Sequence, residues 1–243
     1  MFEAFQIGPF IIWTHLLFLL LGFWLSTEFL LRLAQSSNLS LQHFRDYAWQ
    51  YLVAFIVGGR LFAIVSDYRV YAADWLRVLI LWDGNFSFLG SAIGVGCVIF
   101  FISRGSRTTF LQWLDVLLPA TTFGLTFDWL GKFAAGQDYG APTDMFWAVI
   151  YDSSTVRYTV PIHPVQLYYA FFFFILTFVL LIVRKHTKRA GAETLYGIVL
   201  SGLATMILET FRGDFGIPVF APKLDFALLA LLFLACEDPE RAA

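Results

Sequence analysis

The chain has 243 residues, of which 59% are hydrophobic and only 14% carry a charge, and its mean hydropathy is +0.71. A soluble domain usually carries about 25% charged residues, so this composition argues against a soluble globular protein. It predicts a polytopic membrane protein. The formal net charge of −2 and the lack of a Lys/Arg block give no sign of a nucleic-acid partner.

Apolar runs of about 18 or more residues are typical of membrane helices. We therefore expect an all-α fold with about seven transmembrane helices, forming a single integral membrane domain over residues 1–243. The spans are predicted at residues 10–33, 47–66, 87–103, 113–130, 164–183, 195–211 and 224–236. Pro119 is expected to kink the fourth span. The first run is too long for a cleavable signal peptide and lacks a basic region before it.

Basic residues predict the orientation of these spans. Arg and Lys cluster in short segments after the first, third, fifth and seventh spans, most densely at residues 184–189. The positive-inside rule gives such juxtamembrane clusters the greatest weight. We expect the amino terminus outside and the carboxy terminus in the cytoplasm.

Residues 129–168 differ from the apolar runs around them, because polar side chains such as Lys132, Asp138 and Gln166 are concentrated there among glycines and prolines. Irregular polar backbone is tolerated beside a membrane only where it is wet or buried in protein. The sequence therefore predicts a structured cap on the outer side at about residues 131–163.

The two cysteines, Cys97 and Cys236, lie inside apolar runs and show neither C-x-x-C nor metal-ligand spacing. We interpret them as small buried apolar side chains. We find no set of metal ligands and expect neither a metal nor a cofactor.

Arg60 stands inside the second span, directly after Gly58 and Gly59. A charge at that depth costs a few kcal/mol unless it faces a polar cavity. Arg60 is thus either a cation for a phosphate or a structural arginine paired with an acid such as Glu209. The glycines at 90, 94 and 96 in the third span favour close packing of helices or of a lipid chain.

Three further segments carry polar side chains. Gly131 to Gly140, with Lys132, is either an anion cradle of backbone amides or an ordinary turn. His163 precedes the fifth span and is either catalytic or a hydrogen-bonded anchor. Glu209 and Arg212 are spaced to bridge along one helix face.

Taken in order, these segments resemble the prolipoprotein diacylglyceryl transferase family. The family shows G-[GA]-R-L, G-x-S-F-H-G-G-x-x-G, G-R-x-[GA]-[NC]-F-x-x-G-x-x-x-G, a proline-x-Q-L-Y segment and E-F-x-R. The counterparts here, in the same order, lie at residues 59–61, 84–94, 129–140, 163–168 and 209–212.

The resemblance implies transfer of the diacylglyceryl group of phosphatidylglycerol to the lipobox cysteine of a prolipoprotein in the bacterial plasma (inner) membrane. Its partners would be phosphatidylglycerol and the prolipoprotein signal peptide. The catalytic candidates, one of which would take the thiol proton, are His163, Asp138 and Glu209. The phospholipid-binding candidates are Arg60, Lys132, Gly136, Gly140, Arg212, Gln166, Tyr168, Asn85 and Gly90.

The chain departs from the family pattern where polar residues are expected. Leu89 replaces a histidine, Gln137 an acid and Lys132 an asparagine, and arginines are replaced by Trp129 and Thr205. Two interpretations stay open: a transferase acting through a shifted set of residues, or a catalytically degenerate lipid- or lipoprotein-binding protein of the same fold. Cations that converge on one cavity would favour the enzyme, and apolar packing by Leu89 and Trp129 would favour the binding protein.

Overall fold

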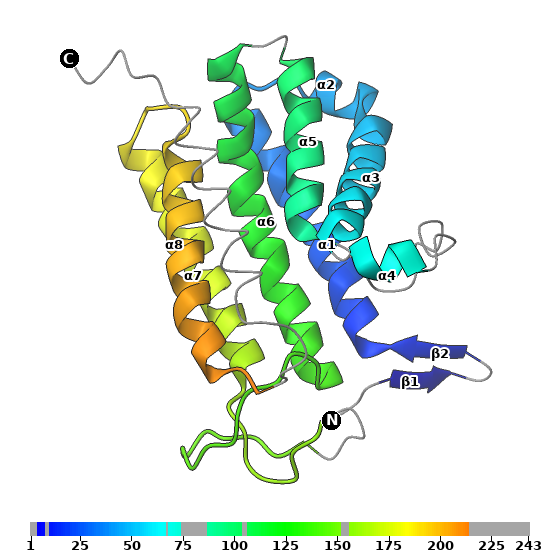
Figure 1. The fold of residues 1–243 in the computed structure, drawn as a ribbon. Helices are drawn as coiled ribbons and strands as arrows, with labels where there is room; N and C mark the ends of the chain where they lie inside the picture. Colours follow the sequence, from blue (N-terminus) through cyan, green and yellow to red (C-terminus); the bar gives the residue numbers. More distant parts are fainter. Residues whose placement is uncertain are drawn as a thin grey trace. The chain divides into compact units, whose positions relative to one another are not determined.

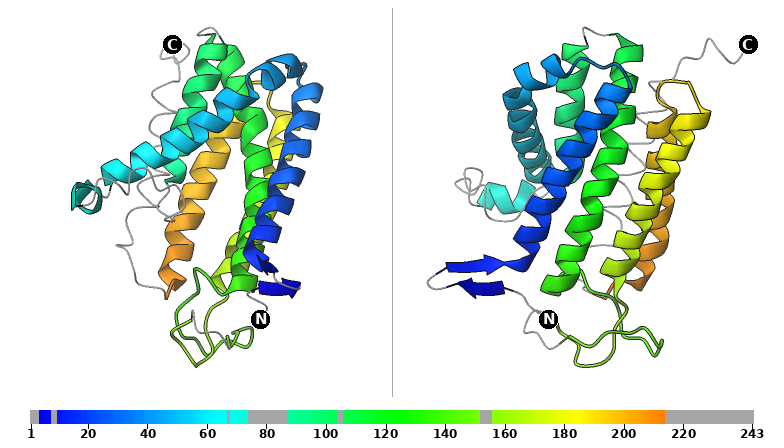
Figure 2. Two further views of the ribbon diagram at one scale, coloured as in Figure 1. Left: turned by 90° about the vertical axis from the view of Figure 1, so that its right-hand side faces the viewer. Right: turned by 180° about the vertical axis from the view of Figure 1, so that it is seen from behind.

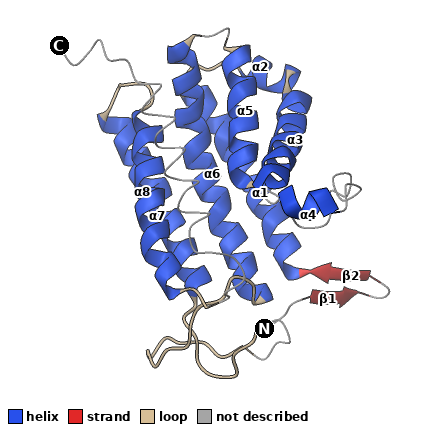
Figure 3. Ribbon diagram, viewed as in Figure 1, coloured by secondary structure: helices blue, strands red, loops and turns tan. Residues whose placement is uncertain are grey.

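The computed structural model of the protein describes residues 4–7, 10–66, 68–73, 87–103, 106–151 and 156–213. They belong to two compact units, one formed by Met1–Leu33 with Asp115–Ala243 and the other by Ala34–Leu114. Figure 3 shows that regular structure in the described residues is helical apart from one antiparallel hairpin.

The hairpin comes first, followed by the helices (Figure 1). Its strands are β1 (Ala4–Ile7) and β2 (Phe10–Trp13). The helices are α1 (Thr14–Ser36), α2 (Leu41–Asp46), α3 (Ala48–Ser66), α4 (Tyr68–Ala73), α5 (Phe88–Ile102), α6 (Arg107–Ala135), α7 (Val165–His186) and α8 (Ala192–Leu208), and α8 continues into a short 3₁₀ turn, η2 (Glu209–Phe211).

Among the described residues, four helical segments are long and apolar enough to cross a membrane: Thr14–Ser36, Ala48–Ser66, Val165–His186 and Ala192–Phe211. The prediction of a helical membrane protein is thereby confirmed. Residues 224–236, the seventh predicted span, lie outside the described residues, and α5 is a shorter apolar helix. The count of seven spans and the outer position of residues 131–163 stay predictions.

The predicted boundaries of the first and fourth spans were wrong. Residues 10–13 belong to β2 rather than to the first span, since the β-branched Ile11 and Ile12 favour a strand and residues 4–7 supply its partner. The fourth predicted span corresponds to α6, which extends five residues into the predicted cap. An ion pair between Asp128 and Lys132, one turn apart on α6, supports that extension.

The core of the first unit lies along one face of α7. Val165, Tyr169, Phe173, Leu176 and Leu180 recur at helical spacing and are buried. Partly buried apolar residues of α6 and α8 pack against them, and the three helices run side by side in Figures 1 and 2. This packing fixes the ends of α6, α7 and α8 relative to one another.

Small residues let α1 approach α6 closely in the same unit. A Cβ atom at Gly22 would lie 3.0 Å from the carbonyl oxygen of Gly124, and one at Gly131 would lie 3.0 Å from Cδ2 of His15. Small residues at a helix crossing permit such backbone approach. The first turn of α1 therefore reaches the last turns of α6.

The second unit contains a close crossing of α3 and α5. A Cβ atom at Gly58 would collide with the carbonyl oxygen of Gly90, and Ser91 Oγ donates to the Phe55 carbonyl at 2.9 Å. Gly90 thus serves helix packing, whereas Gly96 faces open space. The prediction that Cys97 is buried was wrong: its side chain is exposed on α5, an apolar helix, and Cys236 lies outside the described residues.

Candidate functional site

Residues 136–164, which join α6 to α7, are here called the connecting segment. Its described residues, 136–151 and 156–164, lie beyond the ends of both helices (Figure 2). The chain turns sharply as it leaves α6, because Gly136 and Asp138 both adopt the left-handed conformation, with φ of 68° and 51°. This conformation is unusual for a non-glycine residue. It brings the Asp138 carboxylate back toward the end of α6.

Backbone hydrogen bonds fasten the connecting segment between the start of α7 and the end of η2. Gly140 N donates to His163 O at 3.1 Å, Ala141 N to Phe211 O at 2.8 Å, and Gly213 N to Tyr139 O at 3.1 Å. A Cβ atom at Gly140 would collide with the His163 carbonyl, so this close approach requires glycine. Three of the resembling segments thus meet here.

Three backbone amides of the predicted anion cradle are engaged within the protein. Gly136 N donates to Phe133 O at 3.3 Å, Gln137 N to Lys132 O at 3.0 Å, and Gly140 N to His163 O. These bonds favour the turn interpretation of the glycines. A direct contact of Gly136 or Gly140 with lipid stays a prediction.

The polar side chains of this region form a continuous charge network, which consists of His15, Asp128, Lys132, Asp138, Glu209 and Arg212. Lys132 Nζ lies 2.9 Å from Asp138 Oδ2 and 3.4 Å from Asp128 Oδ2. Arg212 Nη2 lies 2.8 Å from Asp138 Oδ1, and Arg212 Nη1 lies 3.0 Å from Glu209 Oε1. The network joins four predicted site residues, Lys132, Asp138, Glu209 and Arg212.

Asp138 is the centre of the network because its two oxygens bind two different cations. Burial alone would raise the pKa of its carboxyl, but the charges of Lys132 and Arg212 outweigh burial and hold that pKa below its usual value. Asp138 is therefore ionised at neutral pH. Its contacts link the two cations.

The network is partly open to solvent. The side chains of Lys132, Asp138 and Arg212 are 23%, 26% and 28% exposed, whereas Glu209 is 7% exposed and also accepts a hydrogen bond from Tyr169 at 3.2 Å. Each cation already contacts carboxylates. A phosphate that reaches Lys132 or Arg212 would share them with those carboxylates.

His163 lies beside the network but belongs to a second chain of contacts. Its Nδ1 lies 3.1 Å from the Tyr168 hydroxyl, which accepts a hydrogen bond from Trp147 Nε1 at 2.6 Å. Its ring centroid is 5.1 Å from that of Phe211. Burial lowers the pKa of His163, so the ring is neutral at pH 7.

Gln166 fastens α7 to the connecting segment. The side chain is fully buried, and its Nε2 donates to the Gln137 carbonyl at 2.6 Å. Its Oε1 has no hydrogen-bond partner among the described residues. The contacts of Gln166 thus show a positioning role for the loop that leaves α6.

Trp129, which stands where the resembling family has an arginine, packs as an aromatic residue. It stacks on Tyr169 with ring centroids 4.1 Å apart and an interplanar angle of 11°, and Lys132 Nζ lies 4.3 Å from the Trp129 ring centroid. Such contact stabilises a cation. The ring therefore orients Lys132 instead of supplying a charge.

The remaining predicted residues belong to the second unit or lie outside the description. Arg60 is 5% exposed, and its Cζ lies 5.1 Å from the ring centroid of Tyr71. Asn85 lies outside the described residues, as does the side chain of Leu89. The convergence of Arg60 with the charge network stays a prediction.

His15 and Asp128 are functional candidates that sequence reasoning missed. His15 Nε2 lies 2.9 Å from Asp128 Oδ1, across 113 positions of sequence. A titratable side chain within an apolar run is a signal for a functional position. That signal was present in the sequence at His15 and was not used.

Comparisons with known proteins identify the family. A family profile described as prolipoprotein diacylglyceryl transferase matches residues 3–236. The chain is 34% identical over 218 residues to a phosphatidylglycerol–prolipoprotein diacylglyceryl transferase of Azospirillum brasilense, a match that covers 86% of this chain and 80% of the relative. It is 27% identical to a protein of the same name from Photobacterium profundum, covering 98% of this chain and 94% of the relative. The chain therefore belongs to the prolipoprotein diacylglyceryl transferase family, a family of lipoprotein-modifying transferases.

Proposed function

We propose that this protein transfers the diacylglyceryl group of phosphatidylglycerol to the lipobox cysteine of prolipoproteins. The observation that carries the proposal is the charge network: Lys132, Asp138, Glu209 and Arg212 come from two distant segments and form one set of contacts. The family match over nearly the whole chain supports the same activity. The cations are held in place before substrate arrives.

The proposed chemistry is a displacement at the glyceryl carbon next to the phosphate. The lipobox thiol loses its proton, the sulfur attacks that carbon, and the carbon–oxygen bond to phosphate breaks. Glycerol phosphate leaves. Negative charge that develops on the departing phosphate needs prepositioned cations, and Lys132 and Arg212 are suited to that role.

The other predicted residues keep proposed roles. Arg60 is proposed to bind the lipid phosphate, and His163, Asp138 and Glu209 remain the catalytic candidates from sequence. Contacts with the lipid headgroup are proposed for Gly136, Gly140, Gln166, Tyr168, Asn85 and Gly90. The bonds of Asp138 and Glu209 to cations favour an electrostatic role for both carboxylates over proton transfer.

We also propose the setting of the reaction. The protein would be a multi-pass protein of the bacterial plasma membrane, a single integral membrane domain with seven spans. Its amino terminus would face outside, its carboxy terminus the cytoplasm, and the connecting segment the outer side. The basic cluster at residues 184–189, which begins in the last turn of α7, supports this orientation.

A second candidate function is binding of lipid or of a lipoprotein signal segment without turnover. Two observations favour it. Trp129 fills the family's arginine position with aromatic packing, and both cations of the network are already paired with carboxylates. Such a protein would hold phosphatidylglycerol and release it unchanged.

The test uses purified full-length protein, phosphatidylglycerol labelled in its diacylglyceryl group, and a lipobox peptide. Transfer predicts label in a thioether on the cysteine, and a Cys→Ser peptide should remain unlabelled. Retention of labelled lipid without product would support the binding protein and contradict the transferase.

The variant Arg60→Ala is expected to abolish transfer, because a buried cation cannot be lost from a phosphate site without loss of charge stabilisation. Arg189→Ala, at an exposed position after α7, is the matched control and should keep wild-type activity. Equal activity of the two variants would remove Arg60 from the site.

A further inference from the structure

We infer that His15, held by Asp128, is the base that accepts the proton of the attacking thiol. The inference rests on the proposed transfer and assigns the base of that reaction to a residue outside the resembling motifs. Its starting point is the 2.9 Å contact between His15 Nε2 and Asp128 Oδ1.

The contact has the form of an oriented histidine base. A carboxylate that binds one ring nitrogen fixes the orientation of the imidazole and leaves the other nitrogen for proton transfer. The His15 and Asp128 side chains are 24% and 23% exposed, so the pair is neither buried in the core nor fully solvated. A substrate group can approach such a pair.

The packing of α1 on α6 builds this position. His15 lies in the first turn of α1, directly after β2, and its Cδ2 lies against the space where Gly131 has no side chain. An alanine at 131 would place a Cβ atom 3.0 Å from Cδ2 and 2.8 Å from the Phe18 Cβ. Gly131 thus makes room for the imidazole beside Asp128.

Asp128 joins the base to the phosphate-binding part of the proposed site. Its Oδ1 contacts His15, and its Oδ2 lies 3.4 Å from Lys132 Nζ. One carboxylate therefore positions a proton acceptor and a cation next to each other. A displacement reaction needs both: a base at the attacking sulfur and a cation at the departing phosphate.

The other candidate bases are less suited. Asp138 and Glu209 each accept from Arg212, and Asp138 also binds Lys132, so their lone pairs are engaged by cations. His163 has a tyrosine hydroxyl, not a carboxylate, at Nδ1. His15, in contrast, contacts a carboxylate through Nε2.

The step balances without a further reactant. The thiol proton moves to Nδ1 of His15 as the sulfur–carbon bond forms, and the carbon–oxygen bond to phosphate breaks. The electron pair of that bond remains on the phosphate oxygen. The imidazolium then returns the proton to the departing glycerol phosphate or to water, which restores the neutral ring.

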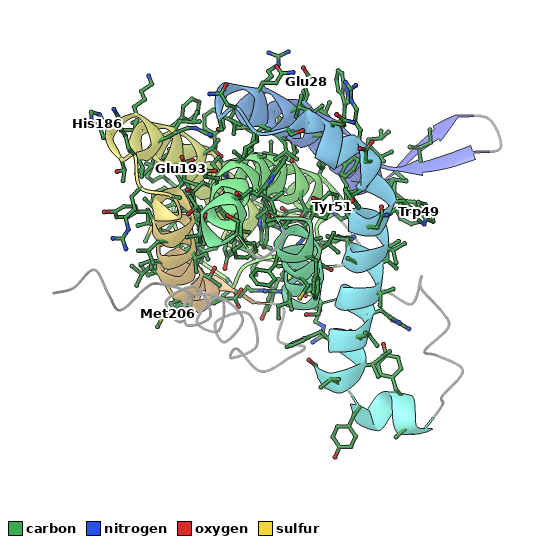
Figure 4. All side chains as sticks on the ribbon, turned by 90° about the horizontal axis from the view of Figure 1, so that it is seen from above. Glu28, Trp49, Tyr51, His186, Glu193 and Met206 are labelled. Carbon is green, nitrogen blue, oxygen red and sulfur yellow. The ribbon has the colours of Figure 1, made fainter. Side chains whose placement is uncertain are left out.

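The experiment compares His15→Gln with His186→Gln in the purified full-length protein, using labelled phosphatidylglycerol and a lipobox peptide. A glutamine amide can still donate to Asp128 but cannot accept a proton. His186, labelled in Figure 4, is an exposed histidine on the last turn of α7 and serves as the matched control.

We expect His15→Gln to lower kcat by about 100-fold or more, the usual contribution of a positioned base, with little change in KM for phosphatidylglycerol. His186→Gln should match the wild type. If His15→Gln keeps its kcat while His15→Phe loses it, His15 only positions Asp128 and the inference is overturned. A wild-type protein that transfers no label would overturn the proposed function and this inference together.

Discussion

Helix α6 carries a buried carboxylate near its first turns and the charge network at its other end, and the two sites differ in kind. Near its first turns, Asp115 is 7% exposed and accepts from Gly191 N at 2.5 Å, Thr194 N at 2.9 Å and Thr194 Oγ1 at 2.7 Å. At its other end lies the charge network, whose side chains are mostly about a quarter exposed. Both groups belong to the first compact unit.

The difference separates a carboxylate that stabilises the fold from the carboxylates of the proposed site. Asp115 is satisfied by donors from the first turn of α8, which it caps from outside that helix. Its three hydrogen bonds hold the start of α8 in place, so a substrate could replace them only at the expense of that helix end. Asp128 and Asp138 each connect partners from different segments, so a substrate can redistribute their contacts. Burial of a charge alone therefore does not mark the site.

Of the variants that test this comparison, one in the charge network is expected to have the largest effect. Asp138→Asn should lower kcat/KM by about 10- to 100-fold, because charge-assisted hydrogen bonds contribute about 1.5–3 kcal/mol and this residue links Lys132 with Arg212. The measurement is label transfer at several lipid concentrations. Asp144→Asn, at an exposed position of the connecting segment, is the control. A similar loss in both variants would show that the loss follows from removing any negative charge of the segment, and not from the link that Asp138 makes between Lys132 and Arg212.

The opposite result is expected at the other end of α6. Asp115→Ala should lower the free energy of unfolding by about 1–3 kcal/mol, since it leaves buried donors of α8 without an acceptor. Turnover per folded molecule should not change. Unfolding in detergent micelles, followed together with transfer, separates the two quantities. A loss of kcat at unchanged stability would contradict the structural role of Asp115.

A glycine pair tests how strictly the backbone of the connecting segment is set. Gly140→Ala should lower the free energy of unfolding by about 1 kcal/mol or more, because overpacking a tight contact forces the backbone to shift. We expect faster proteolysis within residues 136–164 and weaker transfer. Gly96→Ala places its Cβ in open space and should have neither effect. Equal protease resistance of the two variants would refute the tight packing.

The smallest effect concerns pH. Burial lowers the pKa of His163 from its ordinary value of 6.5, so the unfolded chain binds the proton at a higher pH than the folded protein does. Stability should therefore decrease as the pH falls from 6.5 toward the folded pKa, and level off below it. Thermal unfolding across this range should show the decrease in the wild type and less of it in His163→Gln. A larger decrease in the variant than in the wild type would show that protonation of His163 does not cause the loss of stability.

The apolar runs predicted the starts of two helices well, in segments that are apolar along their whole length. α3 and α7 begin within one residue of the predicted starts, because continuous apolar character is a local property. The hairpin was missed because Phe10–Trp13 is as apolar as the helix that follows. Only pairing with residues 4–7 makes that stretch a strand.

The motifs likewise named residues of the site but not their partners. Lys132, Asp138, Glu209 and Arg212 could be listed from the sequence as polar side chains in a chain otherwise rich in apolar ones. Their pairing could not, because Asp138 and Arg212 are 74 positions apart. The interpretation of the Gly136–Gly140 amides as an anion cradle was incomplete for the same reason: their acceptors include a carbonyl of residue 163.

The sequence by itself determined that this chain is a helical membrane protein of one transferase family, since apolar length and ordered motifs are readable without knowledge of contacts. Only the tertiary structure decided which charges meet. The left-handed turn at Gly136 and Asp138 and the glycine-lined approach of α1 to α6 bring Asp138 and His15 to the end of α6. Ion pairs depend on distances of a few ångströms, and those distances are set by packing between segments far apart in the chain.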